Sequence, residues 1–174
     1  MPNYTLLILG AGGYGLAVAE AAELTGQWEK IVFADDRWPE QQHVDCYKII
    51  SNIQSLGDLN KHNFEAIVAI GNNKIRQKLQ HLLLDLFIPM ATIIHPQAII
   101  APSAKIGEGS SVMAGCVIGT NTLIQEGVIL NIGTLLDHDV IIEAFAHLSL
   151  GVKVAGGKII TQHSFLEVGT CIPH

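Results

Sequence analysis

Residues 112–135 read VMAGCV, IGTNTL, IQEGVI and LNIGTL, four blocks of six that each begin with an aliphatic residue. The same period continues on both sides of this stretch. Fourteen aliphatic residues share one register: Ile94, Ile100, Ile106, Val112, Ile118, Ile124, Leu130, Leu136, Ile142, Leu148, Val154, Ile160, Leu166 and Ile172. A period of six matches neither an α-helix nor a simple strand. A run of this length therefore indicates a repeat architecture.

A second column of small or compact residues lies four positions after the first and runs from Ala98 to Thr170. Hexapeptides with an aliphatic and a small inward residue are typical of a parallel β-helix whose coil is a triangle of about 18 residues. Lys158 breaks the second column and predicts a local loop or a register shift after Gly156 and Gly157. The sequence shows no pattern for a cap after the last hexapeptide, so we expect that the chain lacks its natural C-terminus.

The first part of the chain follows a different pattern, in which short apolar strands alternate with helices. Strands are predicted at 6–9, 31–34 and 66–70, and helices at 16–24 and 75–87. This alternation predicts a small Rossmann-like parallel sheet. The predicted fold class is an α/β domain at residues 1–92 followed by a parallel β-helix domain at residues 93–174.

A glycine-rich loop, GAGGYG at residues 10–15, stands between the first strand and the first helix, and Asp35 and Asp36 follow about 20 residues later. Glycines let the backbone approach a phosphate, a helix N-terminus favours its charge, and a carboxylate accepts a hydrogen bond from ribose or base. The spacing fits NAD. However, only about 90 residues precede the β-helix. They are too few for the two mononucleotide-binding halves of a dinucleotide-binding domain, so a single nucleotide is favoured as the ligand. A purely structural tight turn is the alternative.

A second turn, Gly71 to Asn73, follows a strand and opens a helix. It is interpreted either as an N-cap and turn or as a contact to a sugar nucleotide, and the two roles are compatible. Lys74 and Arg76 lie near enough to face a phosphate, but a surface position is favoured for both.

Composition narrows the function classes. Ten Lys and Arg against sixteen Asp and Glu give a net charge of −6 without a basic cluster, which argues against nucleic acid or an anionic membrane as partner. No apolar run reaches the ~18 residues of a membrane span. Three cysteines without CxxC spacing fit a reducing compartment, and a cytoplasmic location follows. Zinc enzymes of the γ-carbonic anhydrase type share the β-helix, but their pair of histidines five apart is absent, so no metal is expected.

Taken together, the motifs resemble the UDP-amino-sugar N-acetyltransferases of the bacillosamine pathway, with relatives in sialic acid and surface-glycan pathways. The resemblance covers essentially the whole chain. It rests on the glycine loop, FADD at 33–36, AIGNNKIR at 69–76, and His138-Asp139 with His147. It implies a left-handed β-helix that binds acetyl-CoA, usually between subunits of a homotrimer, and an α/β domain that binds the UDP-sugar.

The resemblance also implies site residues. His138 would be the catalytic base and Asp139 the carboxylate that orients it, while His147 and the main-chain N–H of Gly156 would contact the thioester end of acetyl-CoA. The UDP-sugar would be bound by Gly10, Gly12, Gly13, Gly15, Asp35, Asp36, Gly71 and Asn72. The hexapeptide register supports a shared position for His138 and Gly156. Each is the third residue of its hexapeptide, and they are one coil apart, so they should stack.

The expected function is acetyl-CoA-dependent N-acetylation of a UDP-linked 4-amino-4,6-dideoxy sugar, for bacterial surface glycan or glycoprotein biosynthesis. Acetyl-CoA is the co-substrate. Two alternatives remain open: O-acetylation of a sugar hydroxyl, as in sialic acid modification, and a non-catalytic module that binds sugar nucleotides.

Overall fold

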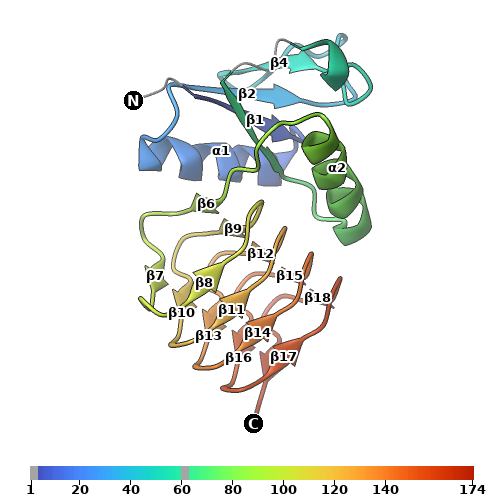
Figure 1. The fold of residues 1–174 in the computed structure, drawn as a ribbon. Coiled ribbons are helices and arrows are strands. Elements are labelled where there is room, and N and C mark those ends of the chain that lie inside the picture. The colour runs from blue at the N-terminus through green and yellow to red at the C-terminus, as the bar shows by residue number, and fades with distance from the viewer. Residues whose placement is uncertain (1–3, 60–62) are drawn as a thin grey trace.

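The computed structural model describes residues 4–59 and 63–174, which form a small α/β unit followed by a stack of short strands (Figure 1). The α/β unit contains β1 (Thr5–Leu9), α1 (Gly13–Thr25), β2 (Lys30–Ala34), β3 (His43–Val44), β4 (Tyr47–Ser51), the 3₁₀ helix η1 (Leu56–Asp58), β5 (Phe64–Val68) and α2 (Asn73–Asp85). The three strands and two helices predicted from the sequence are confirmed. The sequence pattern does not predict β3, β4 or η1.

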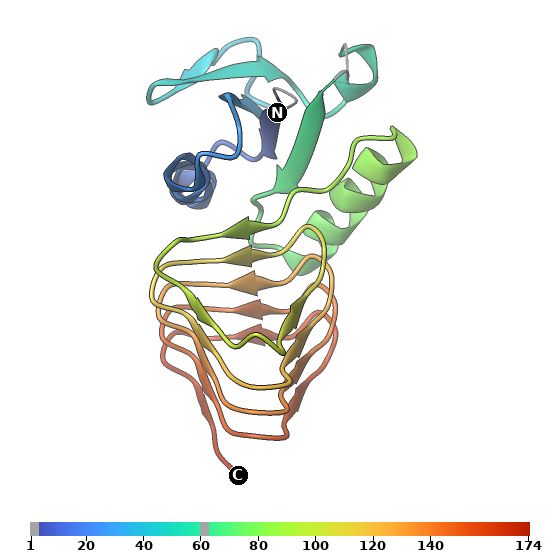
Figure 2. The ribbon, with the colours of Figure 1, turned by 60° about the vertical axis from the view of Figure 1, so that its left-hand side comes forward.

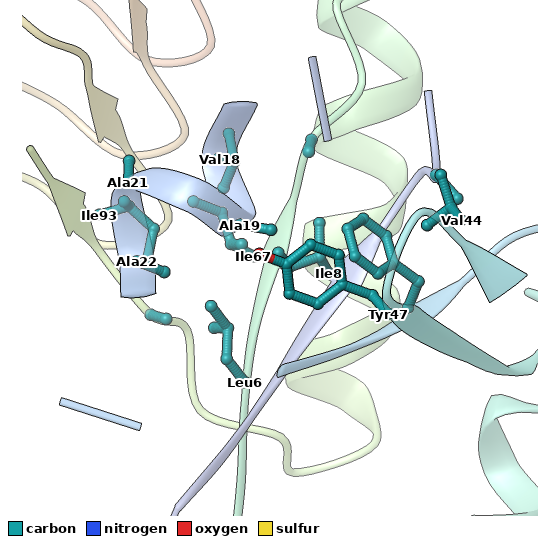
Figure 3. Packing of buried hydrophobic residues seen from close by; sticks show 14 of the residues in the cluster. Leu6, Ile8, Val18, Ala19, Ala21, Ala22, Val44, Tyr47, Ile67 and Ile93 are labelled. Carbon is teal, nitrogen blue, oxygen red and sulfur yellow. The ribbon is translucent and has the colours of Figure 1, made fainter. Parts of the chain in front are cut away.

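The sheet of the α/β unit has the strand order β3-β4-β2-β1-β5, in which only the β3–β4 pair is antiparallel. Because successive side chains of a strand point to opposite faces, Leu6 and Ile8 of β1 pack with α1, whereas Leu7 and Leu9 pack with α2. Figure 3 shows the α1 side of this core. Ile93 joins the same cluster, so α1 lies between the sheet and the first coil of the β-helix (Figure 1).

Both helices begin two or three residues earlier than predicted. Apolar periodicity detects only the buried part of a helix, whereas the first turn is set by its capping. The Asn72 side chain accepts a hydrogen bond of 3.0 Å from the Ile75 N–H and so caps α2, as the turn interpretation predicts. Within the two described ranges, no helix is long and apolar enough to cross a membrane.

The second part of the chain forms fourteen strands of two residues each. They are β6 (Ile93–Ile94), β7 (Ile99–Ile100), β8 (Lys105–Ile106), β9 (Ser111–Val112), β10 (Val117–Ile118), β11 (Leu123–Ile124), β12 (Ile129–Leu130), β13 (Leu135–Leu136), β14 (Ile141–Ile142), β15 (His147–Leu148), β16 (Lys153–Val154), β17 (Ile159–Ile160), β18 (Phe165–Leu166) and β19 (Cys171–Ile172). Figure 2 shows their coils stacked below the α/β unit.

Three parallel sheets form the sides of this β-helix: β7-β10-β13-β16-β19, β8-β11-β14-β17 and β6-β9-β12-β15-β18. Pairing joins residues 18 positions apart, as in Ile118 with Leu136 and Leu136 with Val154. The second residue of each strand points inward and builds the predicted aliphatic column, which forms one hydrophobic cluster. The predicted fold class, an α/β unit followed by a left-handed parallel β-helix, is confirmed.

The loop or register shift predicted at Lys158 is wrong. The Lys158 carbonyl accepts a hydrogen bond of 2.9 Å from the Ile141 N–H, and Ile159 pairs with Ile141 in the regular register. Gly157 has a φ of +70°, and Asn121 and Asp139, which precede it by two coils and one coil, have φ values of +57° and +58°. The two glycines therefore make an ordinary corner of the coil, and the main-chain ladder continues whatever side chain stands at position 158.

Another corner carries α2. Its left-handed positions are Gly109, Gly127, Phe145 and His163, one on each successive coil. A Cβ atom at Gly109 would collide with the side chain of Gln80 on α2, and one at Gly127 would collide with the Phe145 ring. The α2 helix therefore packs on a corner at which the first two coils carry glycine, without a side chain, and the next two carry the large side chains of Phe145 and His163.

Candidate active site

His138 lies at the corner that follows β13, and its ring is held by the next residue. The Nδ1 atom is 2.8 Å from Oδ2 of Asp139, so the aspartate side chain reaches the imidazole. The other carboxylate oxygen of Asp139 accepts a hydrogen bond of 3.2 Å from the Asn121 side-chain amide. Because an ionised carboxylate only accepts hydrogen bonds, Nδ1 carries the hydrogen and Nε2 is left as a basic nitrogen.

Gly156 stacks on His138 in the next coil. The Gly157 N–H donates a hydrogen bond of 2.9 Å to the His138 carbonyl, and a Cβ atom placed on Gly156 would lie 2.6 Å from Nε2 of His138. The imidazole therefore covers the α-carbon of Gly156 and occupies the space that a larger residue would need. The basic nitrogen and the glycine backbone face the same small volume.

Charge around His138 favours its protonated form. The hydrogen bond to Asp139 raises the pKa of His138 above its ordinary value, and the charge of Asp137 adds to this effect. The pKa of Asp139 is lowered by its hydrogen bonds to His138 and Asn121.

Beside this corner, a groove of about 340 Å³ runs over β13, β16 and β19 and is lined by Asp137, Lys153 and Ala155 among others.

The glycine loop divides into packed and open positions. A Cβ atom at Gly15 would collide with the Gly10 carbonyl, and one at Gly10 would lie 2.9 Å from the Ile70 side chain. Gly10 also has a φ of +102°. Gly12 and Gly13 have open space on their Cβ side, at the N-terminus of α1. The first pair lets the loop and helix pack closely, and the second pair leaves the backbone accessible to a ligand.

Asp35 closes this loop. Its carboxylate accepts a hydrogen bond of 2.7 Å from the Ala11 N–H and forms a 2.7 Å ion pair with Nε of Arg37. The hydrogen bond from Arg37 is the main reason that the pKa of Asp35 falls to about 2. Asp36 is directed elsewhere: it accepts a hydrogen bond of 3.2 Å from the Ile53 N–H and borders a cavity of about 730 Å³. Of the two predicted carboxylates, Asp36 is the one beside a cavity.

We expect Asp35→Asn to lower the free energy of unfolding at pH 7 by about 1–2 kcal/mol, because charge-assisted hydrogen bonds to the loop are lost. Folding lowers the pKa of this carboxyl, so its contribution is present above the ordinary value of 3.8 and disappears as the pH falls through about 2. Urea unfolding should therefore show that the difference in free energy of unfolding between the wild type and Asp35→Asn becomes smaller below pH ~4. The exposed Asp85→Asn change is the matched control, and a pH-independent difference would contradict this account.

The turn after β5 meets the β-helix. Gly71 and Asn72 line a cavity of about 390 Å³ together with His163 and Phe165. The Gly71 carbonyl lies 3.2 Å from Nδ1 of His147. His147 is only 9% exposed, and burial lowers its pKa. This turn thus forms part of the junction between the two domains.

The structure places the predicted site residues of the β-helix in two groups, apart from the glycine loop of the α/β unit. His138, Asp139 and Gly156 meet at the corner between two sheets of the β-helix. His147 lies on β15, in the third sheet, against the α/β unit. Within one chain, His147 does not accompany Gly156. In the two described ranges no cluster of three or more His, Cys, Asp or Glu side chains is arranged to hold a metal ion.

Comparison with known proteins finds similar acetyltransferases. A family model described as the PglD N-terminal domain matches residues 5–83. GDP-perosamine N-acetyltransferase of Escherichia coli O157:H7 is 28% identical over 171 residues, which cover 95% of this chain and 76% of that protein. UDP-N-acetylbacillosamine N-acetyltransferase of Bacillus subtilis (strain 168) is 30% identical over 115 residues, covering 62% of this chain and 50% of that protein.

A solved structure also matches almost the whole chain. The acetyltransferase domain of PglB from Neisseria gonorrhoeae FA1090, in complex with acetyl coenzyme A, is 38% identical with a TM-score of 0.92, covering 97% of this chain and 82% of that one. The chain belongs to the bacillosamine-type family of N-acetyltransferases. The resemblance predicted from the motifs and the acyltransferase class are confirmed.

Three residues of this N-acetyltransferase were not predicted to act at the site. Asn121 precedes Asp139 by one coil, so register alone could have placed it there. Arg76 was expected at the surface but is fully buried, and its spacing to Leu79, Gln80 and Leu83 follows the buried face of α2. Arg37 has no sequence signal besides its nearness to Asp35. Lys74, by contrast, is exposed as expected.

Proposed function

We propose that the protein transfers the acetyl group of acetyl-CoA to the amino group of a UDP-linked 4-amino-4,6-dideoxy sugar, in the cytoplasm, with His138 as the general base. The observation that carries this proposal is the corner at His138, where Asp139 holds Nδ1 and leaves Nε2 above the backbone of Gly156. Family membership supports the reaction class.

The chemistry begins with a proton. The amino sugar arrives largely as an ammonium ion, and its nitrogen needs a free lone pair before it can attack. Nε2 of His138 accepts that proton, and the imidazolium so formed is stabilised by the Asp139 carboxylate 2.8 Å from Nδ1. Asp137, about half exposed beside the ring, adds negative charge at the place where the ammonium arrives.

The acyl step follows at Gly156. The neutral amine adds to the thioester carbonyl, and the N–H of Gly156 donates to the oxygen as it gains negative charge. The tetrahedral intermediate then collapses, the C–S bond breaks, and the coenzyme A thiolate leaves and takes up a proton. The groove over β13, β16 and β19 offers a path for the pantetheine arm, and Lys153 supplies a positive charge for its phosphates.

The nucleotide sits at the carboxyl edge of the parallel sheet in this proposal. The open backbone of Gly12 and Gly13 at the N-terminus of α1 receives the phosphates. The cavity bordered by Asp36, Gln54 and Lys78 receives the nucleoside, with Asp36 as the hydrogen-bond acceptor. Gly10, Gly15 and Asp35 shape the loop, while Gly71 and Asn72 line the cavity toward the β-helix.

The active enzyme is proposed to be a homotrimer. Aliphatic side chains are exposed on the outer faces of two β-helix sheets, among them Ile99 at 67% and Ile159 at 57% exposure. Flat apolar faces of a triangular prism suit packing around a threefold axis. A neighbouring subunit would bring an α/β domain and a His147 toward the His138 corner. Light scattering should give three times the mass of the chain, and a monomer at micromolar concentration would contradict the shared site.

Acetyl-CoA consumption tests the function when it is measured against UDP-linked amino sugars, GDP-linked amino sugars and free sugars, with the mass of each product. We expect turnover with a UDP-linked 4-amino sugar and an amide product that resists hydroxylamine. A hydroxylamine-labile ester would establish the O-acetyltransferase alternative. Binding of UDP-sugar without consumption of acetyl-CoA would establish the non-catalytic module.

Asp139→Asn should move the pH dependence of the reaction. The carboxylate raises the pKa of His138, so the wild-type base is lost to protonation at a higher pH than an ordinary histidine. In the variant we expect the acidic limb of the kcat/KM profile to shift to lower pH, with kcat reduced about tenfold because the imidazolium loses its partner. Asp58→Asn, an exposed change in η1, is the control. An unchanged acidic limb would show that Asp139 does not influence the pKa of the base.

A further inference from the structure

Arg76 on α2 is fully buried, and none of its hydrogen-bond partners carries a negative charge. Its Nε atom donates to the Gly127 carbonyl at 2.7 Å, and one Nη donates to the Phe145 carbonyl and to Oδ1 of Asn73, each at 2.8 Å. The other Nη donates to the Ile70 carbonyl at 3.0 Å. Over residues 4–59 and 63–174, no carboxylate forms a salt bridge with Arg76, whose pKa burial lowers to about 10.

These acceptors lie on both sides of the junction between the α/β unit and the β-helix. Ile70 and Asn73 belong to the turn between β5 and α2, while Gly127 and Phe145 occupy the same corner of two successive coils. A buried guanidinium is tolerated only when its donors are satisfied, and its planar fork fixes their directions. Arg76 therefore fixes the position of the turn at 70–73 relative to the β-helix.

The same turn holds His147. The Gly71 carbonyl lies 3.2 Å from Nδ1 of His147 and 3.4 Å from Nη1 of Arg76, so the two side chains share one acceptor. A carbonyl oxygen has no hydrogen to give, so Nδ1 of His147 carries the hydrogen, and Nε2 is a buried acceptor without a hydrogen-bond partner among the described residues. The groups that approach this ring are Arg76 from α2, whose charge opposes protonation, Tyr14 from α1 and Phe165 from β18.

We propose that Arg76 is a positioning residue of the enzyme: it docks the turn at 70–73 onto the β-helix and, through the Gly71 carbonyl, holds His147 as the neutral tautomer with hydrogen on Nδ1. The turn lines the cavity next to His163 and Phe165, so its position sets how the sugar nucleotide is presented. This last consequence rests on the proposed function. The tautomer of His147 does not, because it is a property of the free protein.

Nitrogen-15 NMR of histidine-labelled protein tests the tautomer directly, with His147→Gln to assign the signal. In the wild-type protein we expect His147 to be in the neutral Nδ1–H form at about pH 8, and burial, which lowers its pKa, to delay its protonation as the pH falls. An Nε2–H tautomer, or an imidazolium at about pH 8, would overturn the proposal without any change at Arg76. This measurement uses no substrate, so its outcome is independent of the proposed reaction.

Arg76→Lys tests the docking, because lysine keeps the charge but loses the planar fork. We expect His147 to become a mixture of tautomers, and KM for the sugar nucleotide to rise about tenfold with kcat changed less than threefold. Lys30→Gln, an exposed change on β2, should leave all of these unchanged. A KM for the sugar nucleotide equal to that of the wild type, or an unchanged His147 signal, would show that Arg76 supports stability alone. Absence of turnover in the wild-type protein would instead count against the proposed function.

Discussion

His138→Ala is expected to lower kcat by about 10²- to 10⁴-fold, the usual contribution of a general base. The loss is large because no described side chain duplicates Nε2 at this corner: Asp139 is bound to the other ring nitrogen, and a carboxylate such as that of Asp137 is a weaker base than an imidazole. The ring is more than half exposed, so its removal leaves no cavity in the core. Steady-state rates with saturating substrates measure the effect.

Two controls accompany this variant. Acetyl-CoA affinity, measured by calorimetry, should change little, because the base contacts the amine and not the coenzyme. His43→Ala removes an exposed imidazole from the α/β unit and should leave kcat unchanged. If His138→Ala retains near wild-type turnover on the correct substrate, the base lies elsewhere, and the proton is taken up by the substrate itself or by a group outside this corner.

Gly156→Ala should lower kcat by about 10²-fold with little change in thermal stability. The added methyl group would lie 2.6 Å from Nε2 and 2.7 Å from Cε1 of His138, so the imidazole must move. His138 is at the surface and has room to rotate, which keeps the energetic cost to the fold small. The base is nevertheless displaced by an ångström or more, and such misplacement is enough to slow catalysis by this factor.

The matched control for this prediction is Gly157→Asn. Gly157 has a left-handed backbone, and its counterparts one and two coils earlier are Asp139 and Asn121, so asparagine is accommodated there. Its Cβ position is open and does not face His138. We expect Gly157→Asn to keep most of the activity. Equal loss in both variants would mean that the corner tolerates no substitution and that the effect at Gly156 is not specific to the base.

The β-helix was predictable because its period is geometric: the same inward position recurs every six residues, and hydrogen bonding to the previous coil needs nothing from the side chain. Stacking of His138 and Gly156 follows from that register alone. Residues 43–58 were not predictable, because two short strands and a 3₁₀ turn leave no sustained alternation. Asp35 was assigned to a ligand from its spacing, yet the structure directs it to Ala11 and Arg37, a pairing that depends on how the loop closes in space.

Arg76 shows that a charged residue type does not by itself predict an exposed position. Its acceptors come from residues 70 to 146, a span that no local pattern covers. Only the helical spacing of Arg76 with Leu79 and Leu83 hinted that it lies on the buried face. Long-range acceptors of this kind are main-chain carbonyls, which leave no trace in residue identity.

The graded corner beneath α2 limits how this solenoid can change in length. Coils of a repeat protein are ordinarily interchangeable modules, because each contacts only its neighbours. Here Gly109 and Gly127 make room for Gln80, while Phe145 and His163 fill the space that follows, so each of these coils has an individual place in the order. Duplicating or deleting one of them would slide the docking surface past α2 by a full rung. Coils can therefore be added only outside this block. The fixed order of these coils sets the distance from the α/β unit to His138.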